Sequence, residues 1–373
     1  MEGIMDIFIA SDLDYVRESV FLLTHYCNDP LAALDSERLI KKYKFDDPVM
    51  LNQIDACVKI NEYVISHLPF SKEELGLYFH RMKGFNECPC DYLMLFGRKP
   101  AKSLKEELQR VTDMSEEVRL KEFFMQLLYD NLVESEASVD QVENLTGTGL
   151  MQALQKTDMT DQERLLLLQI FWDPQPHLKK MEAYLSETIK LLKDCADRIQ
   201  VLTTSFHRQW TEILKNTDIY TFLRDHAEVS LDCNSLGYCI YPTVSYFHSC
   251  VMVISDEETR PRSRDLFYVG IITADALPYN EGDRELKADL TQYLKLLGDK
   301  SKLDILTMIK EERLYGAELA RRMNLSNATI SHHMSALLDA GLVRLEKENT
   351  RLYYSSNKEK LEELLEILKQ QLL

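Results

Sequence analysis

The sequence predicts a mainly α-helical protein (α+β), with a large helical N-terminal domain that contains a small β-sheet and a second, smaller C-terminal domain. Three observations lead to this class. Apolar side chains recur every three or four positions over the first 225 residues. Residues 228–273 are rich in Val, Ile, Tyr and Phe, which favour strands. The last 90 or so residues alternate short helical patterns with two short strand patterns.

Helical spacing is clearest at several places in the N-terminal half. Residues 12–26, 48–67 and 115–132 each predict an amphipathic helix. Ser71 precedes Glu74 by three positions, the pattern of a capping box, and so predicts a helix start. Ser115 predicts a weaker start of the same kind.

The longest helical pattern covers residues 176–216. One apolar stripe continues from Leu178 to Ile213, and it predicts a single helix of roughly 60 Å at about 1.5 Å per residue. A helix of that length suits a scaffold or a strut across a dimer better than a compact enzyme core.

The strand-rich region predicts a small sheet. Residues 238–246, 250–254 and 266–273 are its expected strands, and the polar residues 255–265 form the loop of a hairpin. Residues 277–285 contain Pro, Asn and Gly and predict a linker. The expected domains are therefore residues 1–285, whose role is effector binding or dimerisation, and residues 286–373.

Charge separates these two parts of the chain. The whole protein has 44 Lys and Arg against 61 Asp and Glu, a net charge of −17, which excludes a basic protein that coats nucleic acid. Residues 286–373 hold 14 basic and 13 acidic residues, a net of +1, so the remaining residues carry −18. This division allows local DNA binding but predicts weak non-specific affinity with a steep salt dependence.

The sequence also predicts a soluble cytoplasmic protein without a membrane partner. Its longest dense apolar run, residues 165–172, is far shorter than the ~20 residues of a membrane span, and no basic stretch precedes the apolar residues near Met1. The eight cysteines show no Cys-x-x-Cys pair and suit a reducing compartment.

Some cysteines and aromatic residues leave two interpretations open. Cys88 and Cys90, which flank a proline, read either as half of a metal or redox site or, as we favour, as loop cysteines. The same choice applies to Cys239 and Cys250. The aromatic residues at 238–247 form either the lining of a small-molecule pocket or, as we favour, the core of the sheet.

The C-terminal residues predict a compact succession of short elements. Asp299 caps a helix at 300–309, Asn324 and Leu325 form a tight turn, Ser326 caps the next helix and Gly341 ends it. Helix, short turn, helix and a two-stranded ribbon is the layout of a winged helix-turn-helix. The expected helices are 290–297, 300–309, 315–323, 327–340 and 358–373, and the expected strands are 342–347 and 351–355.

Helix 327–340 is the expected DNA-reading helix. Ile330, Met334 and Leu337 share one apolar face, so short polar side chains face the other way, where they can bond to base edges in a major groove. Ser326 and the first-turn amides can bind a phosphate, and the small Ala328 permits close approach. Wing residues Lys347 and Arg351 are expected to contact the DNA backbone. The expected base-reading residues are Asn327, Thr329, Ser331, His332 and Ser335.

These motifs resemble those of ArsR-type regulators. The resemblance rests on residues 294–306, on the segment Glu318-Leu-Ala through Leu325-Ser-Asn-Ala-Thr-Ile-Ser-His-His-Met to Val343, and on Arg351-Leu-Tyr-Tyr354. It implies a homodimer that reads a pseudo-palindromic double-stranded DNA operator, usually a repressor released by a ligand. Metal-sensing members carry Cys-x-Cys before the Asp/Glu-Leu-Ala motif, whereas this chain has Tyr315-Gly316-Ala317, and its last helix has no His. We therefore expect no metal and no cofactor.

A leucine stripe on the last helix predicts a homodimer, because a small winged domain cannot cover all of it. The expected dimerisation residues are Leu294, Leu361, Leu364, Leu365 and Leu368.

The sequence thus predicts a dimeric transcription regulator, controlled by a non-metal signal such as a small-molecule effector at the N-terminal domain. No catalytic motif stands out, so an enzyme is not expected. Two alternatives remain: a small-molecule-binding protein, or an interaction adaptor whose winged helix does not read DNA.

Overall fold

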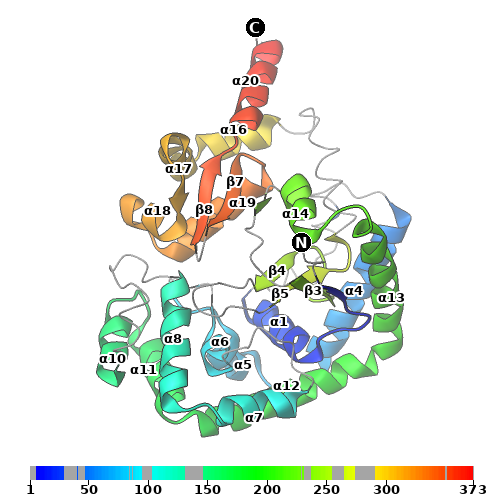
Figure 1. Ribbon diagram of the computed structural model, residues 1–373, viewed down its shortest axis with the longest axis vertical. Helices are drawn as coiled ribbons and strands as arrows, with labels where there is room; N and C mark the ends of the chain where they lie inside the picture. The colour runs from blue at the N-terminus through cyan, green and yellow to red at the C-terminus, as the bar shows by residue number, and fades with distance from the viewer. Residues whose placement is uncertain are drawn as a thin grey trace, which may run out of the picture. The chain divides into compact units, whose positions relative to one another are not determined.

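The computed structural model describes residues 6–28, 40, 47–83, 85, 87–94, 103–130, 146–227, 229–230, 237–253, 264–273, 290–348 and 351–372. The fold is mainly α-helical with small sheets, as predicted (Figure 1). The predicted linker 277–285 and most of the predicted loop 255–265 lie outside the described residues.

The chain forms two compact units that each combine several segments. Unit 1 contains residues 1–126, 139–215 and 234–276, and unit 2 contains residues 127–138, 216–233 and 277–373. Unit 2 thus includes two internal segments, 127–138 and 216–233, that lie within the predicted N-terminal domain.

Several helices of unit 1 begin close to where the sequence predicts, although α6, α7, α10 and α11 were not predicted. Helix α4 has the predicted bounds, and Asp47 caps it by accepting from the amides of Val49 and Met50. The capping box of Ser71 and Glu74 is present at the start of α5. The helices that begin in unit 1 are α1 (Tyr15–Asn28), α4 (Pro48–His67), α5 (Lys72–Phe79), α6 (Pro89–Met94), α7 (Leu104–Thr112), α8 (Glu116–Asp130), α10 (Gly147–Gln155), α11 (Asp161–Trp172), α12 (Pro174–Asp194) and α13 (Ala196–Ile213).

The long helix predicted over residues 176–216 is divided in two, so that prediction is wrong. Helix α12 ends at Asp194, Cys195 has φ −95° and ψ 11°, and α13 begins at Ala196. The amide of Cys195 bonds to the carbonyl of Leu192, an i−3 contact that ends the α-helical ladder. The apolar stripe continues across the break, because Leu192 and Ile199 are both fully buried. Periodicity alone therefore could not reveal it.

A four-stranded sheet lies in unit 1, in the order β1-β3-β5-β4. Strands β1, β3 and β5 are parallel, and β4 is antiparallel to β5. The sequence analysis missed β1, which is four residues long and pairs with a strand more than 220 residues later. The strands are β1 (Asp6–Ile9), β3 (Gly237–Thr243), β4 (Cys250–Val253) and β5 (Asp265–Gly270).

Buried polar bonds tie α1 to the carboxyl end of β3. Glu18 is 2% exposed, and its Oε1 accepts from the amides of Val244 and Ser245 and from the Ser245 hydroxyl, at 3.1, 2.7 and 2.5 Å. The Tyr268 hydroxyl on β5 donates to Asp14 at 3.0 Å. Of the aromatic residues at 238–247, Tyr238 and Phe247 are buried, as expected of a sheet core, whereas Tyr241 and Tyr246 are half-buried.

The cysteines of unit 1 lie in poorly reactive surroundings. The thiol of Cys88 contacts Asp91 Oδ2 at 3.1 Å, and that of Cys90 contacts Met181 Sδ at 3.8 Å. The hydrogen bond to Cys90 and burial raise the pKa of Cys88 well above its usual value, and burial raises the pKa of Cys90. Burial likewise raises the pKa of Cys239, and that of Cys250 to about 12. A buried thiol with a raised pKa is a weak nucleophile and metal ligand.

Unit 2 contains the C-terminal elements and a sheet in the order β2-β7-β8-β6. In the part of the chain that the structure describes, no helix is both long enough and apolar enough to cross a membrane. The elements are α14 (Ile219–Ala227), β2 (Val229–Ser230), α16 (Leu290–Gly298), α17 (Lys300–Glu311), β6 (Leu314–Tyr315), α18 (Gly316–Met323), α19 (Asn327–Asp339), β7 (Val343–Glu348), β8 (Arg351–Ser356) and α20 (Lys358–Leu372).

Candidate nucleic-acid interface

The turn between α18 and α19 has the predicted chemistry. Asn324 adopts the left-handed conformation with φ 54°, which suits Asn better than most residues. The amide of Leu325 bonds to the carbonyl of Ala320 at 2.9 Å and closes the end of α18. These contacts set the direction in which α19 leaves the turn.

Helix α19 is capped and anchored as the sequence predicts. The Ser326 hydroxyl accepts from the amide of Thr329 at 3.1 Å and lies 2.8 Å from the Thr329 hydroxyl. Ile330, Met334 and Leu337 are all 0% exposed and belong to the core of unit 2. At the far end Gly341 has φ 66°, a conformation that favours glycine.

The polar side of α19 is accessible to different degrees. His332 and Ser335 are exposed, whereas Asn327, Thr329 and Ser331 are half-buried near the start of the helix. The side chain of Ala328 lies outside the described residues. The structure thus leaves short hydroxyl groups and one imidazole on the side of α19 opposite its core-facing residues.

The adjacent His333 differs from His332. It is half-buried, and burial, together with the nearby positive charge of Lys302, lowers its pKa. The two imidazole rings lie 6.2 Å apart at 45°. The surroundings of His333 therefore disfavour its charged form.

The wing is a regular two-stranded ribbon. Strands β7 and β8 pair antiparallel from Val343 with Ser356 to Glu348 with Arg351. The side chains of Lys347 and Arg351 lie outside the described residues, so their contact with DNA stays a prediction.

A residue that the sequence analysis missed, Asn357, holds the wing to the end of α19. Its side-chain amide donates to the carbonyl of Gly341, and its backbone amide donates to that of Leu342, both at 2.9 Å. Its Oδ1 accepts from the amide of Lys360 at the start of α20. An Asn directly before a helical pattern is a helix-capping signal that could have revealed it.

Several arginines of unit 2 are held by acidic neighbours. Arg322 contacts Glu318 at 2.6 Å and Glu312 at 2.7 Å, and Arg321 contacts Glu318 at 2.6 Å. Hydrogen bonds from these two arginines lower the pKa of Glu318. Arg344 pairs with Glu359 at 2.8 Å on the wing side. Any phosphate contact by these arginines competes with their internal partners.

The predicted dimerisation residues fall into two groups. Leu361, Leu364 and Leu368 pack against the core of unit 2, so the same chain covers this part of the leucine stripe. Leu294 and Leu365 are 46% and 57% exposed and remain available to a partner.

The described residues also provide no evident metal centre. In the ranges that the structure describes, no group of three or more His, Cys, Asp and Glu could hold a metal ion.

Comparison with known proteins identifies the family of this chain. Residues 299–344 match the profile of the bacterial regulatory protein, arsR family. The chain is 32% identical over 80 residues to the arsenical resistance operon repressor of Staphylococcus aureus, a match that covers 21% of this chain and 77% of the relative. It is 35% identical over 74 residues to the repressor of the same name from Staphylococcus xylosus, covering 20% and 71%.

A third relative carries the name of a transcriptional activator. The transcriptional activator HlyU of Vibrio cholerae is 31% identical over 75 residues, which cover 20% of this chain and 69% of the relative. No solved structure matches significantly. Since matches above 30% identity span more than two thirds of these relatives, the chain belongs to the ArsR family of helix-turn-helix, DNA-binding transcription regulators.

Proposed function

We propose that this protein binds a pseudo-palindromic operator as a homodimer and regulates transcription in response to a non-metal signal received by unit 1. Helix α19 enters the major groove, where Asn327, Thr329, Ser331 and His332 contact base edges. Ser326 and the first-turn amides bind a phosphate, and Lys347 and Arg351 contact the backbone from the wing.

One observation carries this proposal: α19 has a fully buried apolar face and an opposite face of short polar groups. Ile330, Met334 and Leu337 fix the rotation of the helix about its axis. Exposed His332 and Ser335 then lie on the side that a groove would meet. Hydroxyl and imidazole groups can donate hydrogen bonds to base edges and accept hydrogen bonds from them.

The signal is assigned to unit 1 because the known metal-sensing position of the family is empty of ligands. Tyr315-Gly316-Ala317 offers neither thiolate nor imidazole. The relatives named as arsenical resistance repressors therefore suggest the DNA-binding mode of this chain but not its effector.

The proposal is tested by selecting bound sequences from random duplexes with the full-length protein and then measuring operator affinity. Thr329→Ala and His332→Ala should each relax discrimination at one base position per half-site by ~1 to 3 kcal/mol. Thr204→Ala, an exposed threonine on α13, is the matched control and should leave the preference unchanged.

Two outcomes would contradict the proposal. Unchanged discrimination in both α19 variants would remove these residues from base reading. Failure of the wild-type protein to enrich any sequence would favour the alternative in which the protein is an interaction adaptor.

A further inference from the structure

The outer edge of the wing sheet is closed by a strand from the middle of the chain. In the order β2-β7-β8-β6, β2 lies beside β7 and runs parallel to it. Val229 pairs with Leu345, and Ser230 pairs with Glu346. Strand β7 therefore has a partner on both sides, β8 on one and β2 on the other.

This strand belongs to a segment whose two ends are covalently continuous with residues of unit 1. Residues 216–233 are part of unit 2, whereas residues up to 215 and from 234 onward are part of unit 1. A change within unit 1 can thus act on β2 through these two covalent connections, and no further contact is needed.

Helix α14 anchors the segment on one side of β2. Ile219, Tyr220, Phe222 and Leu223 are at most 6% exposed, so this short helix has a well-buried apolar face. The helix directly precedes β2 in the chain and contacts it.

The pairing itself is short. Among the described residues two residues of β2 join the ladder, and Val229 is half-buried beside Leu345, which is 7% exposed. So short a ladder can open locally while the core of the domain stays folded. The contact therefore has the properties of an element that docks and detaches.

The described residues of β2 pair with the middle of β7. Their partners are Leu345 and Glu346, whereas the pairing of β7 with β8 runs from Val343 to Glu348. Docked β2 thus supports β7 between the two ends of its ladder with β8.

We propose that β2 is a docking strand that positions the wing for DNA, and that unit 1 regulates operator binding by holding or withdrawing it. This inference rests on the proposed function. With β2 docked, the wing is held where Lys347 and Arg351 meet the backbone. With β2 withdrawn, β7 has a free edge, and the apparent affinity falls in proportion to the docked fraction.

A reversible crosslink tests the proposal in the full-length protein. Val229→Cys with Leu345→Cys, in a Cys233→Ser background, places two thiols on paired residues of neighbouring strands, within the range of a disulfide. Hydrogen exchange at residues 343–346 reports docking, and titration with the selected operator reports affinity. The single variant Leu345→Cys, treated in the same way, is the control for oxidation.

Two further variants open the contact. Val229→Pro, which removes an amide and constrains the backbone of β2, should weaken operator binding about tenfold if the docked fraction falls to about a tenth. A Gly-Ser-Gly-Ser insertion after Lys215 should weaken binding by the reduced double-cysteine protein and leave its oxidised form unchanged.

The outcomes separate the inference from the proposed function. Equal operator affinity of oxidised, reduced, inserted and proline variants would overturn the inference, as would failure of the two thiols to crosslink. If the wild-type protein selects no operator, the proposed function itself fails, whereas crosslinking and hydrogen exchange still report whether β2 docks.

Discussion

Glu18 is a carboxylate that the fold buries and then satisfies with hydrogen bonds. Burial raises its pKa, while the bonds from Ser245, Thr243 and Val244 act in the opposite direction. The net direction is upward, so the folded protein holds the Glu18 proton more tightly than the unfolded chain does.

The sign of the resulting pH dependence follows from proton linkage. Between the ordinary pKa of 4.5 and the raised folded value, the folded state binds more protons than the unfolded state. Stability contributed by Glu18 is therefore present below pH 4.5 and falls as pH rises through this window.

We predict that Glu18→Gln removes this loss of stability at higher pH, because the Gln side chain does not ionise. Its carbonyl oxygen still accepts from the Val244 and Ser245 amides. The variant should gain free energy of unfolding relative to wild type as pH is raised from 4.5 to 7.5, measured by urea titration. Glu18→Ala, which leaves the buried donors unpaired, should instead cost about 1–3 kcal/mol. A wild-type–Gln difference that is constant with pH would refute the raised pKa.

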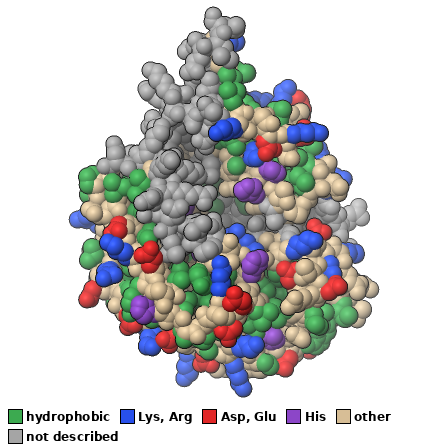
Figure 2. Space-filling view, turned by 180° about the vertical axis from the view of Figure 1, so that it is seen from behind, with side chains coloured by type: hydrophobic (Ala, Val, Ile, Leu, Met, Phe, Trp, Pro, Cys, Tyr) green, Lys and Arg blue, Asp and Glu red, His purple; other side chains and the backbone are tan. Residues whose placement is uncertain are grey.

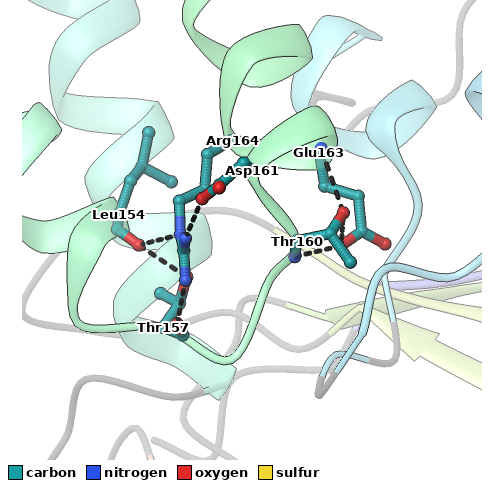
Figure 3. A network of polar contacts seen from close by, with 6 residues as sticks. All are labelled: Leu154, Thr157, Thr160, Asp161, Glu163 and Arg164. Atoms are coloured by element: carbon teal, nitrogen blue, oxygen red, sulfur yellow. Dashed lines mark hydrogen bonds and ion pairs between the residues drawn. The ribbon is translucent and has the colours of Figure 1, made fainter.

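At the scale of single elements, Arg164 in the first turn of α11 forms hydrogen bonds with the end of the preceding helix, α10. Arg164 donates from Nε to the carbonyl of Leu154 at 3.0 Å and from Nη2 to that of Thr157 at 2.7 Å (Figure 3). It also pairs with Asp161 at 2.8 Å. In the same turn Thr160 and Glu163 form a capping box for α11. Arg164 thus satisfies carbonyls at the end of α10 while belonging to α11.

We predict that Arg164→Met lowers the free energy of unfolding by about 1–2 kcal/mol, because carbonyls at the end of α10 lose a charged donor while the apolar stem is retained. Lys59→Met is the control, since Lys59 forms an exposed i,i+4 pair with Asp55 and contributes little. Equal stability of the two variants by thermal or urea denaturation would contradict this role.

Local chemistry explains which elements the sequence predicted. Asp299, Ser326 and Gly341 are helix-capping residues, which are recognised from the few residues around them. The structure has each of them at the predicted helix end. The break at Cys195 was missed because the apolar stripe continues through it. Strands β1, β2 and β6 were missed because short strands depend on partners far along the chain.

The same distinction applies to the site. The rotation of α19 was predictable because Ile330, Met334 and Leu337 share a helical face. The internal pairing of Arg321 and Arg322, and the covering of Leu364 by its own domain, required the tertiary structure.

For the whole molecule, acidic and basic side chains are interspersed over the face shown in Figure 2. The net charge of −17 opposes approach to DNA at long range, so attraction must come from the few cations next to the helix and the wing. The salt dependence of binding should therefore report how many of these cations contact phosphates.

We predict that Arg351→Ala weakens binding to the operator and to random duplex by similar factors, because a phosphate contact carries no sequence information. The slope of log affinity against log salt concentration should become less steep by about one per half-site. Fluorescence anisotropy at several salt concentrations measures both. A loss confined to the operator would instead make Arg351 a base-reading residue.

The assembly should depend on the exposed leucines rather than on the whole stripe. We predict that Leu365→Glu shifts the protein from dimer to monomer in light scattering at micromolar concentration while its helical content in circular dichroism stays unchanged, since Leu365 is 57% exposed. Leu364→Glu, at 1% exposure, should destabilise the fold by burying an unpaired charge. A wild-type protein that elutes as a monomer would exclude this dimer.

The pairing of Val229 with Leu345 has a consequence for biosynthesis. At 5–20 residues per second, a ribosome needs about 6 to 23 s to add the 116 residues that separate them. During that interval the nascent polypeptide presents β2 without its neighbour. This pairing of unit 2 therefore cannot form until the ribosome has added Leu345 and Glu346.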